Sequence, residues 1–245
     1  MKYIVIIGAT SLIAEHCARI WVQREPIHLT LVGRSPSKLN ALKNDLSIRS
    51  PRSLIECEII NFLDPNAIQT LVARLCTQQP IDIVLIAQGV LPSQHECQHN
   101  LLTCHEALNI NALSPVLFAE AFASSMEEKQ HGQIALISSV AGDRSRRSNY
   151  TYGAAKALCT AYAEGLQHRF SGTRVAITII KPGPTNTPMT ANFTRMTLAP
   201  VEQVSKQIVH GISKRKQIIY TPKKWAWIMR LVRRLPRFVF NQLNL

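Results

Sequence analysis

The sequence is short of acidic residues, and it lacks long apolar runs, repeats and low-complexity tracts. Its 245 residues include 28 Lys and Arg against 15 Asp and Glu, which gives a formal net charge of +13. The apolar run at residues 3–7 is too short for a signal-peptide core or a membrane-spanning helix. With a hydrophobic fraction of 46% and no linker, the chain is expected to form one large ordered domain.

The six cysteines include no C-x-x-C pair, and no export signal accompanies them. Cysteines spread in this way across a large chain are expected to stay reduced. We therefore expect a cytoplasmic protein, and the basic tail described below favours a peripheral position on the membrane.

Short runs of apolar, β-branched residues alternate with longer segments of helical periodicity. The expected strands lie near residues 2–7, 27–32, 54–60, 81–87, 133–138, 174–180 and 217–220, the last preceded by a helix at 201–213. This alternation predicts an α/β fold with a doubly wound parallel sheet, Rossmann-like, covered by helices on both faces. Ligands of such sheets bind beyond the carboxyl ends of the strands.

The spacing Y-x-x-x-K joins Tyr152 to Lys156. On a helix, this spacing places the phenol and the ammonium on one face. A free tyrosine has a pKa of about 10, and a neighbouring cation favours the phenolate, so Lys156 is expected to lower the pKa of Tyr152. The phenol is then suited to general acid or base catalysis.

Residues 8–14 follow the first expected strand, where a glycine-rich turn would lead into a helix N-terminus. Backbone N–H groups and the helix dipole at such a turn attract a pyrophosphate. Only Gly8 of that pattern is present, because Leu12 and Ala14 stand where further glycines are expected. An ordinary strand–helix turn is therefore an equal interpretation of this segment taken alone.

Arg34 ends the second expected strand, where an NAD-binding protein usually offers a carboxylate to the ribose 2′-hydroxyl. A guanidinium can instead hold a 2′-phosphate with two hydrogen bonds. No acidic residue lies nearby in the sequence, so Arg34 favours NADP(H) over NAD. A solvated arginine at a strand end is the alternative.

The combined pattern resembles the short-chain dehydrogenase/reductase family from residue 3 to about residue 220. The family's catalytic tetrad is matched in order and spacing by Asn111, Ser139, Tyr152 and Lys156. The resemblance implies a catalytic domain over residues 1–220, followed by a tail at 221–245. It also implies a homo-oligomer.

For this family, the resemblance implies carbonyl reduction by NADPH. The hydroxyls of Ser139 and Tyr152 would bind the carbonyl oxygen, and Tyr152 would give its proton. Lys156 would hold the ribose hydroxyls, and Asn111 would position a water that links Lys156 to solvent.

Other strand ends match the cofactor contacts of the family less closely. Asn61-Phe62 fall where the adenine is contacted, Ala87-Gln88-Gly89 replaces the usual N-A-G, and Pro182-Gly183 with Thr187 match the nicotinamide loop. The complete set of expected NADP(H) contacts is Gly8, Thr10, Ser11, Leu12, Ile13, Arg34, Asn61, Phe62, Gln88, Gly89, Tyr152, Lys156, Pro182, Gly183, Thr185 and Thr187.

The segment from His95 to His99 satisfies the zinc pattern H-E-x-x-H, with Glu120 as a conceivable third ligand. Pro92-Ser93 come immediately before it, and little apolar periodicity supports a helix there. We therefore expect no metal site. Loss of activity on chelation would favour the zinc alternative.

Two loops near the expected cleft differ in character. Residues 143–148 are basic and either meet a phosphate or carboxylate of the substrate or are merely solvated. Residues 188–200 stand where the family has a mobile substrate lid, and their apolar members are Met189, Phe193, Met196 and Leu198. An apolar lid favours an apolar substrate, although a lid packed on its own domain shows the same pattern.

The basic excess lies in the C-terminal part, where Glu202 is the only acidic residue after Glu164. Plotted as a helix, residues 223–235 place the arginines and Lys223 on one side and apolar residues on the other side, with Trp227 at the edge of the apolar side. That other side holds Trp225, Ile228, Met229, Leu231, Val232 and Leu235. The pattern predicts contact with an anionic membrane surface through 222–237, with packing on the core or a second subunit as the alternative. Nucleic-acid binding is not expected, because no recognition motif accompanies the charge.

Taken together, the residues and the resemblance predict an NADPH-dependent enzyme that reduces an amphipathic or lipid-linked ketone to a secondary alcohol. The alternative is a regulatory or scaffold protein that binds NADP(H) at the membrane surface without turnover. The incomplete glycine turn motivates that alternative, and the complete tetrad opposes it.

Overall fold

A parallel sheet of seven strands forms the centre of the computed structural model, which describes residues 1–191 and 197–243. The strand order is β3-β2-β1-β4-β5-β6-β7. The strands are β1 (Lys2–Ile7), β2 (Ile27–Gly33), β3 (Leu54–Ile59), β4 (Ile83–Ile86), β5 (Gln133–Ile137), β6 (Ala176–Pro182) and β7 (Ile218–Thr221). The order changes direction between β1 and β4, which confirms the predicted doubly wound sheet.

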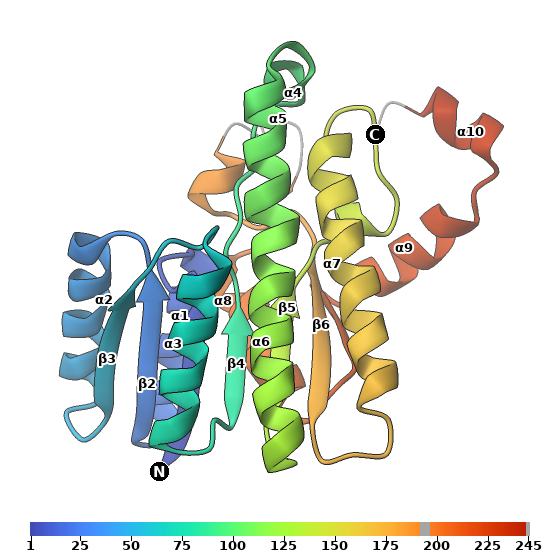
Figure 1. Ribbon diagram of the computed structural model, residues 1–245. Helices are drawn as coiled ribbons and strands as arrows, with labels where there is room; N and C mark the ends of the chain where they lie inside the picture. Colours follow the sequence, from blue (N-terminus) through green and yellow to red (C-terminus); the bar gives the residue numbers. More distant parts are fainter. Residues whose placement is uncertain (192–196, 244–245) are drawn as a thin grey trace.

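Helices cover both faces of the sheet (Figure 1). One face carries α1 (Leu12–Arg24), α2 (Pro36–Arg49) and α8 (Val201–Ser213), and the other carries α3 (Pro65–Gln78), α6 (Ser114–Lys129) and α7 (Tyr150–Arg169). The connection from β4 to α6 contains α4 (Gln94–His99), α5 (Leu101–Leu108) and the π-helical turn η1 (Asn109–Leu113). Two 3₁₀ turns, η2 (Val140–Gly142) and η3 (Pro188–Thr190), follow β5 and β6.

Local sequence explains where these elements begin. Asp64 caps α3, because its carboxylate accepts hydrogen bonds from the backbone N–H groups of Asn66 and Ala67 at 2.9 and 3.3 Å, and Pro65 suits the first helical turn. All seven residues of β2 are buried, because helices cover both sides of the strand. Its buried polar residues are bonded within the fold, since the Thr30 Oγ1 lies 3.0 Å from the Tyr3 hydroxyl and the His28 Nε2 lies 2.7 Å from Glu56 Oε2.

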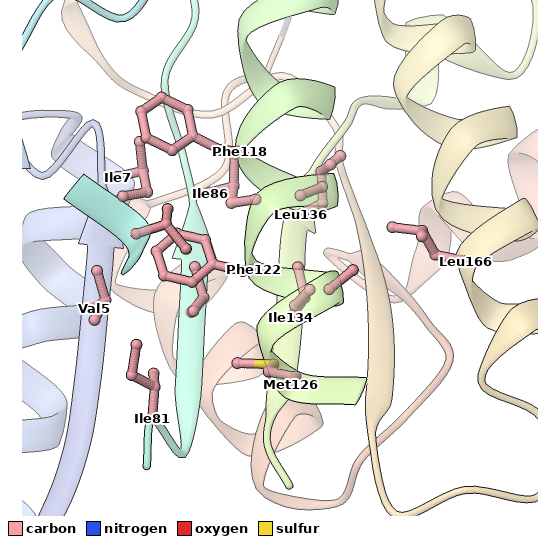
Figure 2. Packing of buried hydrophobic residues seen from close by; sticks show 14 of the residues in the cluster. Val5, Ile7, Ile81, Ile86, Phe118, Phe122, Met126, Ile134, Leu136 and Leu166 are labelled. Carbon is pink, nitrogen blue, oxygen red and sulfur yellow. The ribbon is translucent and has the colours of Figure 1, made fainter. Parts of the chain in front are cut away.

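Aromatic residues of α6 fill the space between that helix and the central strands. Figure 2 shows Phe118 and Phe122 against Ile7 and Ile86 of β1 and β4. Both phenylalanine side chains are fully buried. Burial of one such side chain stabilises the fold by about 1.5–3 kcal/mol. This packing holds η1, which leads directly into α6, beside the strand ends.

The predicted strands all form, with small shifts at their ends. The strand predicted at 174–180 is β6, which runs on to Pro182 because Lys181 and Pro182 pair with Tyr220 and Thr221 of β7. The predicted helix at 201–213 matches α8. Such shifts arise because pairing with a neighbouring strand decides where a strand ends.

The tail forms two helices, α9 (Lys224–Arg234) and α10 (Arg237–Gln242), beyond β7 (Figure 1). The side chains on the predicted apolar side of α9 differ in burial: some pack on the protein and others are exposed to solvent. Met229 is buried and Trp225 packs against Gly183, whereas the side chains of Trp227 and Leu231 are 73% and 66% exposed. No helix in the described ranges is long and apolar enough to cross a membrane. The division of the chain at residue 220 stays a prediction.

Candidate active site

A cleft with a cavity volume of about 680 Å³ lies beyond the carboxyl ends of β1, β4, β5 and β6. Ser139, Tyr152 and Lys156 all line it. The expected cofactor contacts in its wall, besides Tyr152 and Lys156, are Ser11, Ile13, Gln88, Gly89, Pro182, Gly183, Thr185 and Thr187. The structure therefore brings together most of the side chains that the sequence singles out.

Ser139 follows β5 directly and begins the turn η2. Its Oγ accepts a hydrogen bond of 3.1 Å from the backbone N–H of Ala141. The preceding Ser138 fastens α7 to the strand, because its Oγ donates to the carbonyl oxygen of Lys156 at 2.9 Å and contacts Thr160 Oγ1 at 2.8 Å. The end of β5 thus fixes both the serine and the helix that carries Tyr152.

Tyr152 and Lys156 lie one turn apart on α7. The Lys156 Nζ is 5.8 Å from the centroid of the Tyr152 ring and donates to the carbonyl oxygen of Ile137 at 3.1 Å. The Lys156 side chain is almost completely buried, and this burial lowers its pKa. The ammonium is therefore directed towards the end of β5.

Burial raises the pKa of Tyr152 to about 12, and its hydrogen bond with Ser139 acts in the opposite direction. This finding corrects the expectation that Lys156 lowers the tyrosine pKa. The physical reason is desolvation, which disfavours a phenolate, while the Lys156 ammonium is bonded to the carbonyl oxygen of Ile137. At neutral pH the Tyr152 phenol is protonated, which is the form that donates a proton.

Asn111 is fully buried in η1 and does not belong to the cleft wall. Its Nδ2 donates to the carbonyl oxygen of Ala107 at 2.8 Å, and its Oδ1 accepts from the Val90 N–H at 2.9 Å. A Cβ on Gly89 would lie 3.0 Å from Asn111 Oδ1 and 3.6 Å from Lys156 Nζ. Asn111 therefore joins the helix to the loop after β4, and its role in holding a water stays a prediction.

The turn from β1 to α1 requires glycine at its first position. Gly8 has φ +75°, and a Cβ there would lie 2.6 Å from the backbone nitrogen of Gln88. Ser11 begins α1 without a side-chain cap, so backbone N–H groups of the first turn point beyond the strand end. Ala14 is fully buried in the core, where its methyl group packs in place of a further glycine.

Leu12 and Thr10 lie outside the wall of the cleft. Leu12 lines a neighbouring cavity of about 520 Å³, which it shares with Thr187. Gln88 uses its Nε2 to contact Ser114 Oγ at 3.2 Å, while its Oε1 is buried and has no hydrogen-bond partner among the described residues.

The expected adenine end of the site is more exposed. Arg34 and Asn61 are both exposed at the ends of β2 and β3, and neither lines the cleft. Phe62 is buried, and its ring meets that of Phe118 edge to face at 5.4 Å between centroids. The Phe62 side chain therefore belongs to the core, which leaves only its backbone for an adenine contact.

The sequence gives little support for a helix at the H-E-x-x-H segment, and the structure corrects this, because the segment forms the short helix α4. His95 and His99 are exposed on this helix, and their ring centroids lie 4.3 Å apart. Glu120 is bound elsewhere, by Arg169 and by the Tyr162 hydroxyl, both at 2.7 Å. Across residues 1–191 and 197–243, no three His, Cys, Asp or Glu side chains are grouped as a metal site.

Only part of the expected lid can be placed. Met189 lines the cleft, and Leu198 lines the neighbouring cavity. The Thr190 hydroxyl donates to the carbonyl oxygen of Thr185 at 2.5 Å and so holds η3 against the strand end. Phe193 and Met196 lie outside the described residues.

Two features of the site are not evident in the sequence. Gln94 accepts a 2.9 Å hydrogen bond from the backbone N–H of Thr151 and contacts its hydroxyl at 3.1 Å, beside Tyr152. Asp143 is buried with Lys181 at 2.5 Å, and it accepts a 2.6 Å hydrogen bond from Tyr220. Neither has a local sequence signal, because their partners lie far along the chain.

Solved dehydrogenase structures share this fold. A short-chain dehydrogenase from Sphingobium yanoikuyae in complex with NADPH has a TM-score of 0.83 and 21% sequence identity, over 97% of both chains. A bulky-bulky ketone specific alcohol dehydrogenase from Comamonas testosteroni has a TM-score of 0.81 and 20% identity, over 97% of this chain and 96% of that one. The fold is thus that of known dehydrogenases.

Sequence comparison then gives the family. The model of the family described as short chain dehydrogenase matches residues 2–198, and the chain belongs to this family of oxidoreductases. An uncharacterised oxidoreductase of Streptomyces coelicolor is 27% identical over 243 residues, which are 99% of this chain and 96% of that protein. Another, from Mycobacterium tuberculosis, is 30% identical over 175 residues, which are 71% and 70% of the two chains.

Proposed function

We propose that the protein is an NADPH-dependent reductase that converts a ketone to a secondary alcohol. The observation that carries this proposal is the meeting of Ser139 and Tyr152 in one cleft, with the tyrosine protonated at neutral pH. Two proteins of the same fold were solved with NADPH or NADP, and a third is a ketone-specific alcohol dehydrogenase. These likenesses support the choice of cofactor and substrate class.

The residues present fit a dinucleotide. The uncapped N-terminus of α1 offers backbone N–H groups to a pyrophosphate, and Gln88 Oε1 is a buried acceptor that lacks a partner within the described ranges. Arg34 is exposed at the end of β2 and has no carboxylate partner in the described part of the chain, so it is free to bind a 2′-phosphate. When bound, NADPH supplies the hydride.

The side chains of this protein then stabilise the negative charge on the carbonyl oxygen and supply the proton that the oxygen receives. The hydroxyls of Ser139 and Tyr152 donate hydrogen bonds to the carbonyl oxygen, where negative charge develops during reduction. Tyr152 transfers its proton to that oxygen. Lys156 adds positive charge beside the cleft and offers hydrogen bonds to ribose hydroxyls. Asn111 keeps the loop after β4 against the helix that leads into α6.

A ketone panel with NADPH tests the function, with Tyr152→Phe as the variant. We expect the wild-type protein to oxidise NADPH in the presence of at least one ketone, and the variant to be slower by about 10²–10⁴-fold. Tyr150→Phe is the matched control, because Tyr150 is exposed two residues earlier on α7 and lies outside the cleft. NADPH binding without turnover of any ketone would instead favour the scaffold alternative.

We also propose that the tail holds the enzyme on an anionic membrane, in the cytoplasm, where it meets an amphipathic or lipid-linked ketone. The exposed face of the tail supports this, because Trp227, Leu231 and Phe238 are 66–73% exposed among arginines and lysines. The joint change Trp227→Ser and Leu231→Ser should abolish binding to vesicles of phosphatidylserine and phosphatidylcholine. The same changes at Leu101 and Leu102, exposed on α5, should leave binding intact. Absence of wild-type binding would exclude the membrane role.

We also propose that the protein forms a homo-oligomer. Exposed leucines on three elements that contact one another support it: Leu113 of η1, Leu117 of α6 and Leu158 of α7. Leu117→Glu should convert the oligomer to a monomer in sedimentation experiments, because burial of a carboxylate against apolar surface is costly. A wild-type monomer would contradict this part.

A further inference from the structure

One arginine of the basic loop 143–148 belongs to the wall of the catalytic cleft. The loop follows η2 and leads into α7, so it connects the elements that carry Ser139 and Tyr152. Of its three arginines, only Arg146 lines the cleft, and it is half-buried there. Arg147 is exposed and lies outside the lining.

The residues before Arg146 are fixed by buried contacts. The carboxylate of Asp143 lies 2.5 Å from Lys181 Nζ, and both side chains are only 2% exposed. Arg144 is bound by the tail, because its Nη1 donates to the carbonyl oxygens of Val232 and Leu235 at 2.6 and 2.7 Å. Its guanidinium also lies 3.8 Å from the centroid of the Phe240 ring. The first part of the loop is therefore held by β6 and by the tail.

The residues directly on either side of Arg146 are held at the start of α7. Ser145 lies so close to Gly153 that a Cβ on the glycine would be 2.7 Å from the serine Oγ. The carbonyl oxygen of Arg146 accepts a 3.1 Å hydrogen bond from the Asn149 N–H, which closes a turn just before the helix. Because both flanks are fixed, the loop places the Arg146 side chain near the first turn of α7, which carries Tyr152.

The charge of Arg146 is not balanced within the cleft. The lining contains no Asp or Glu among the described residues, and its only cations are Arg146 and Lys156. Arg146 forms no ion pair with any carboxylate in residues 1–191 and 197–243. Burial lowers the pKa of Arg146, yet a guanidinium stays charged at neutral pH. A partly desolvated cation without a counter-ion gains free energy when an anion binds.

Apolar side chains also line the cleft, where they can contact the uncharged part of a ligand. Leu91 and Pro92 come from the loop after β4, Val140 from η2 and Met189 from η3. The buried Asn149 Oδ1, beside the turn at Arg146, has no hydrogen-bond partner in the described part of the chain. The cleft thus combines these apolar side chains with a second cation, Arg146, besides Lys156.

Resting on the proposed function, we propose that the substrate is a ketone bearing a carboxylate or phosphate, which Arg146 binds through its guanidinium. The planar guanidinium can give two parallel hydrogen bonds to either anion. Arg146 therefore acts as a specificity-determining residue: it fixes the anionic end of the ketone while the apolar lining receives its body.

Matched pairs of ketones test this proposal with the full-length protein. The pairs are benzoylformate with its methyl ester, for the carboxylate, and 4-acetylphenyl phosphate with 4-methoxyacetophenone, for the phosphate. We expect Arg146→Gln to lower kcat/KM for the anionic member of at least one pair by about 10- to 100-fold, and for its neutral partner by less than about twofold. Arg147→Gln is the control and should change neither. An equal loss on anionic and neutral ketones would overturn the proposal.

A binding measurement separates this proposal from the reductase function. The protein saturated with NADP⁺ is titrated calorimetrically with benzoate, phenyl phosphate and benzamide, so that the cofactor's own phosphate sites are occupied. We expect at least one anion to bind in wild type and Tyr152→Phe but not in Arg146→Gln, and benzamide not to bind. Anion binding without turnover of any ketone would remove the reductase function and leave the anion site. Turnover with no effect of Arg146→Gln on either anion would remove the anion site alone.

Discussion

The cleft wall formed by β5 and α7, here called the fixed wall, is held by buried contacts. The β1–α1 turn together with the end of β2, which lies outside the cleft lining, is here called the open wall, because it leaves its polar groups open. On the first wall, Ser138 ties the helix to the strand, and the Lys156 ammonium is bonded to the carbonyl oxygen of Ile137. On the second, α1 begins without a side-chain cap, and Arg34 is exposed.

This difference separates two tasks. Groups that handle a developing charge must be placed before the reaction, because their reorganisation would add to the barrier. Groups that bind the phosphates of a cofactor need only be reachable, since the ligand itself orders them. We therefore propose that the fixed wall sets the reaction and that the open wall sets which nicotinamide cofactor is used.

The largest expected effect concerns the pH dependence that the fixed wall imposes. Burial raises the pKa of Tyr152 to about 12, so its phenol stays protonated at lower pH. Reduction uses that protonated form, and its kcat should be flat between about pH 6 and 9. Oxidation of the alcohol needs the phenolate, whose fraction rises about tenfold per pH unit, or about a thousandfold from pH 7 to 10.

Steady-state rates in both directions, with one ketone and its alcohol, check this prediction. The control is Tyr150→Phe, which should give the wild-type profile because Tyr150 lies outside the cleft. An oxidation rate that levels off near neutral pH would contradict the raised tyrosine pKa.

A smaller effect is expected at the open wall. Arg34→Asp replaces a cation by an anion where a 2′-phosphate would bind, and it leaves the fixed wall untouched. We expect the ratio of kcat/KM for NADPH over NADH to fall by about 10- to 100-fold, with kcat for the preferred cofactor nearly unchanged. Arg52→Asp, at an exposed position in the turn between α2 and β3, is the charge-matched control. An unchanged ratio would remove Arg34 from the cofactor site.

The smallest effect concerns the β1–α1 turn, where it approaches the loop after β4. Gly8→Ala would place a Cβ 2.6 Å from the backbone nitrogen of Gln88 at φ +75°, so it should lower the free energy of unfolding by about 1–3 kcal/mol. Gly165→Ala is the control, because a Cβ on this α7 residue meets nothing within 4 Å, and it should stabilise by about 0.5–1 kcal/mol. Urea unfolding measures both, and equal effects would contradict the close approach at Gly8.

The sequence predicts the sheet and the meeting of Ser139, Tyr152 and Lys156, because strand periodicity and helical spacing are local properties. It does not predict the direction of the Tyr152 pKa shift, which depends on burial by residues distant in the chain. Nor does it predict that the tail turns Met229 inward and Leu231 outward, because both belong to the same predicted apolar side of the helix. Contacts across the fold decide each of these features.

Transfer of deuterium tests the central claim most directly, namely that NADPH reduces a ketone beside a proton-donating Tyr152. NADPH carrying deuterium at both hydrogen positions of nicotinamide C4 is incubated with a ketone and the wild-type protein, and the alcohol is examined by mass spectrometry and NMR. We expect one deuterium on the carbinol carbon, and almost no alcohol from Tyr152→Phe, which should still bind NADPH. An alcohol without deuterium, or equal rates for the two proteins, would contradict the claim.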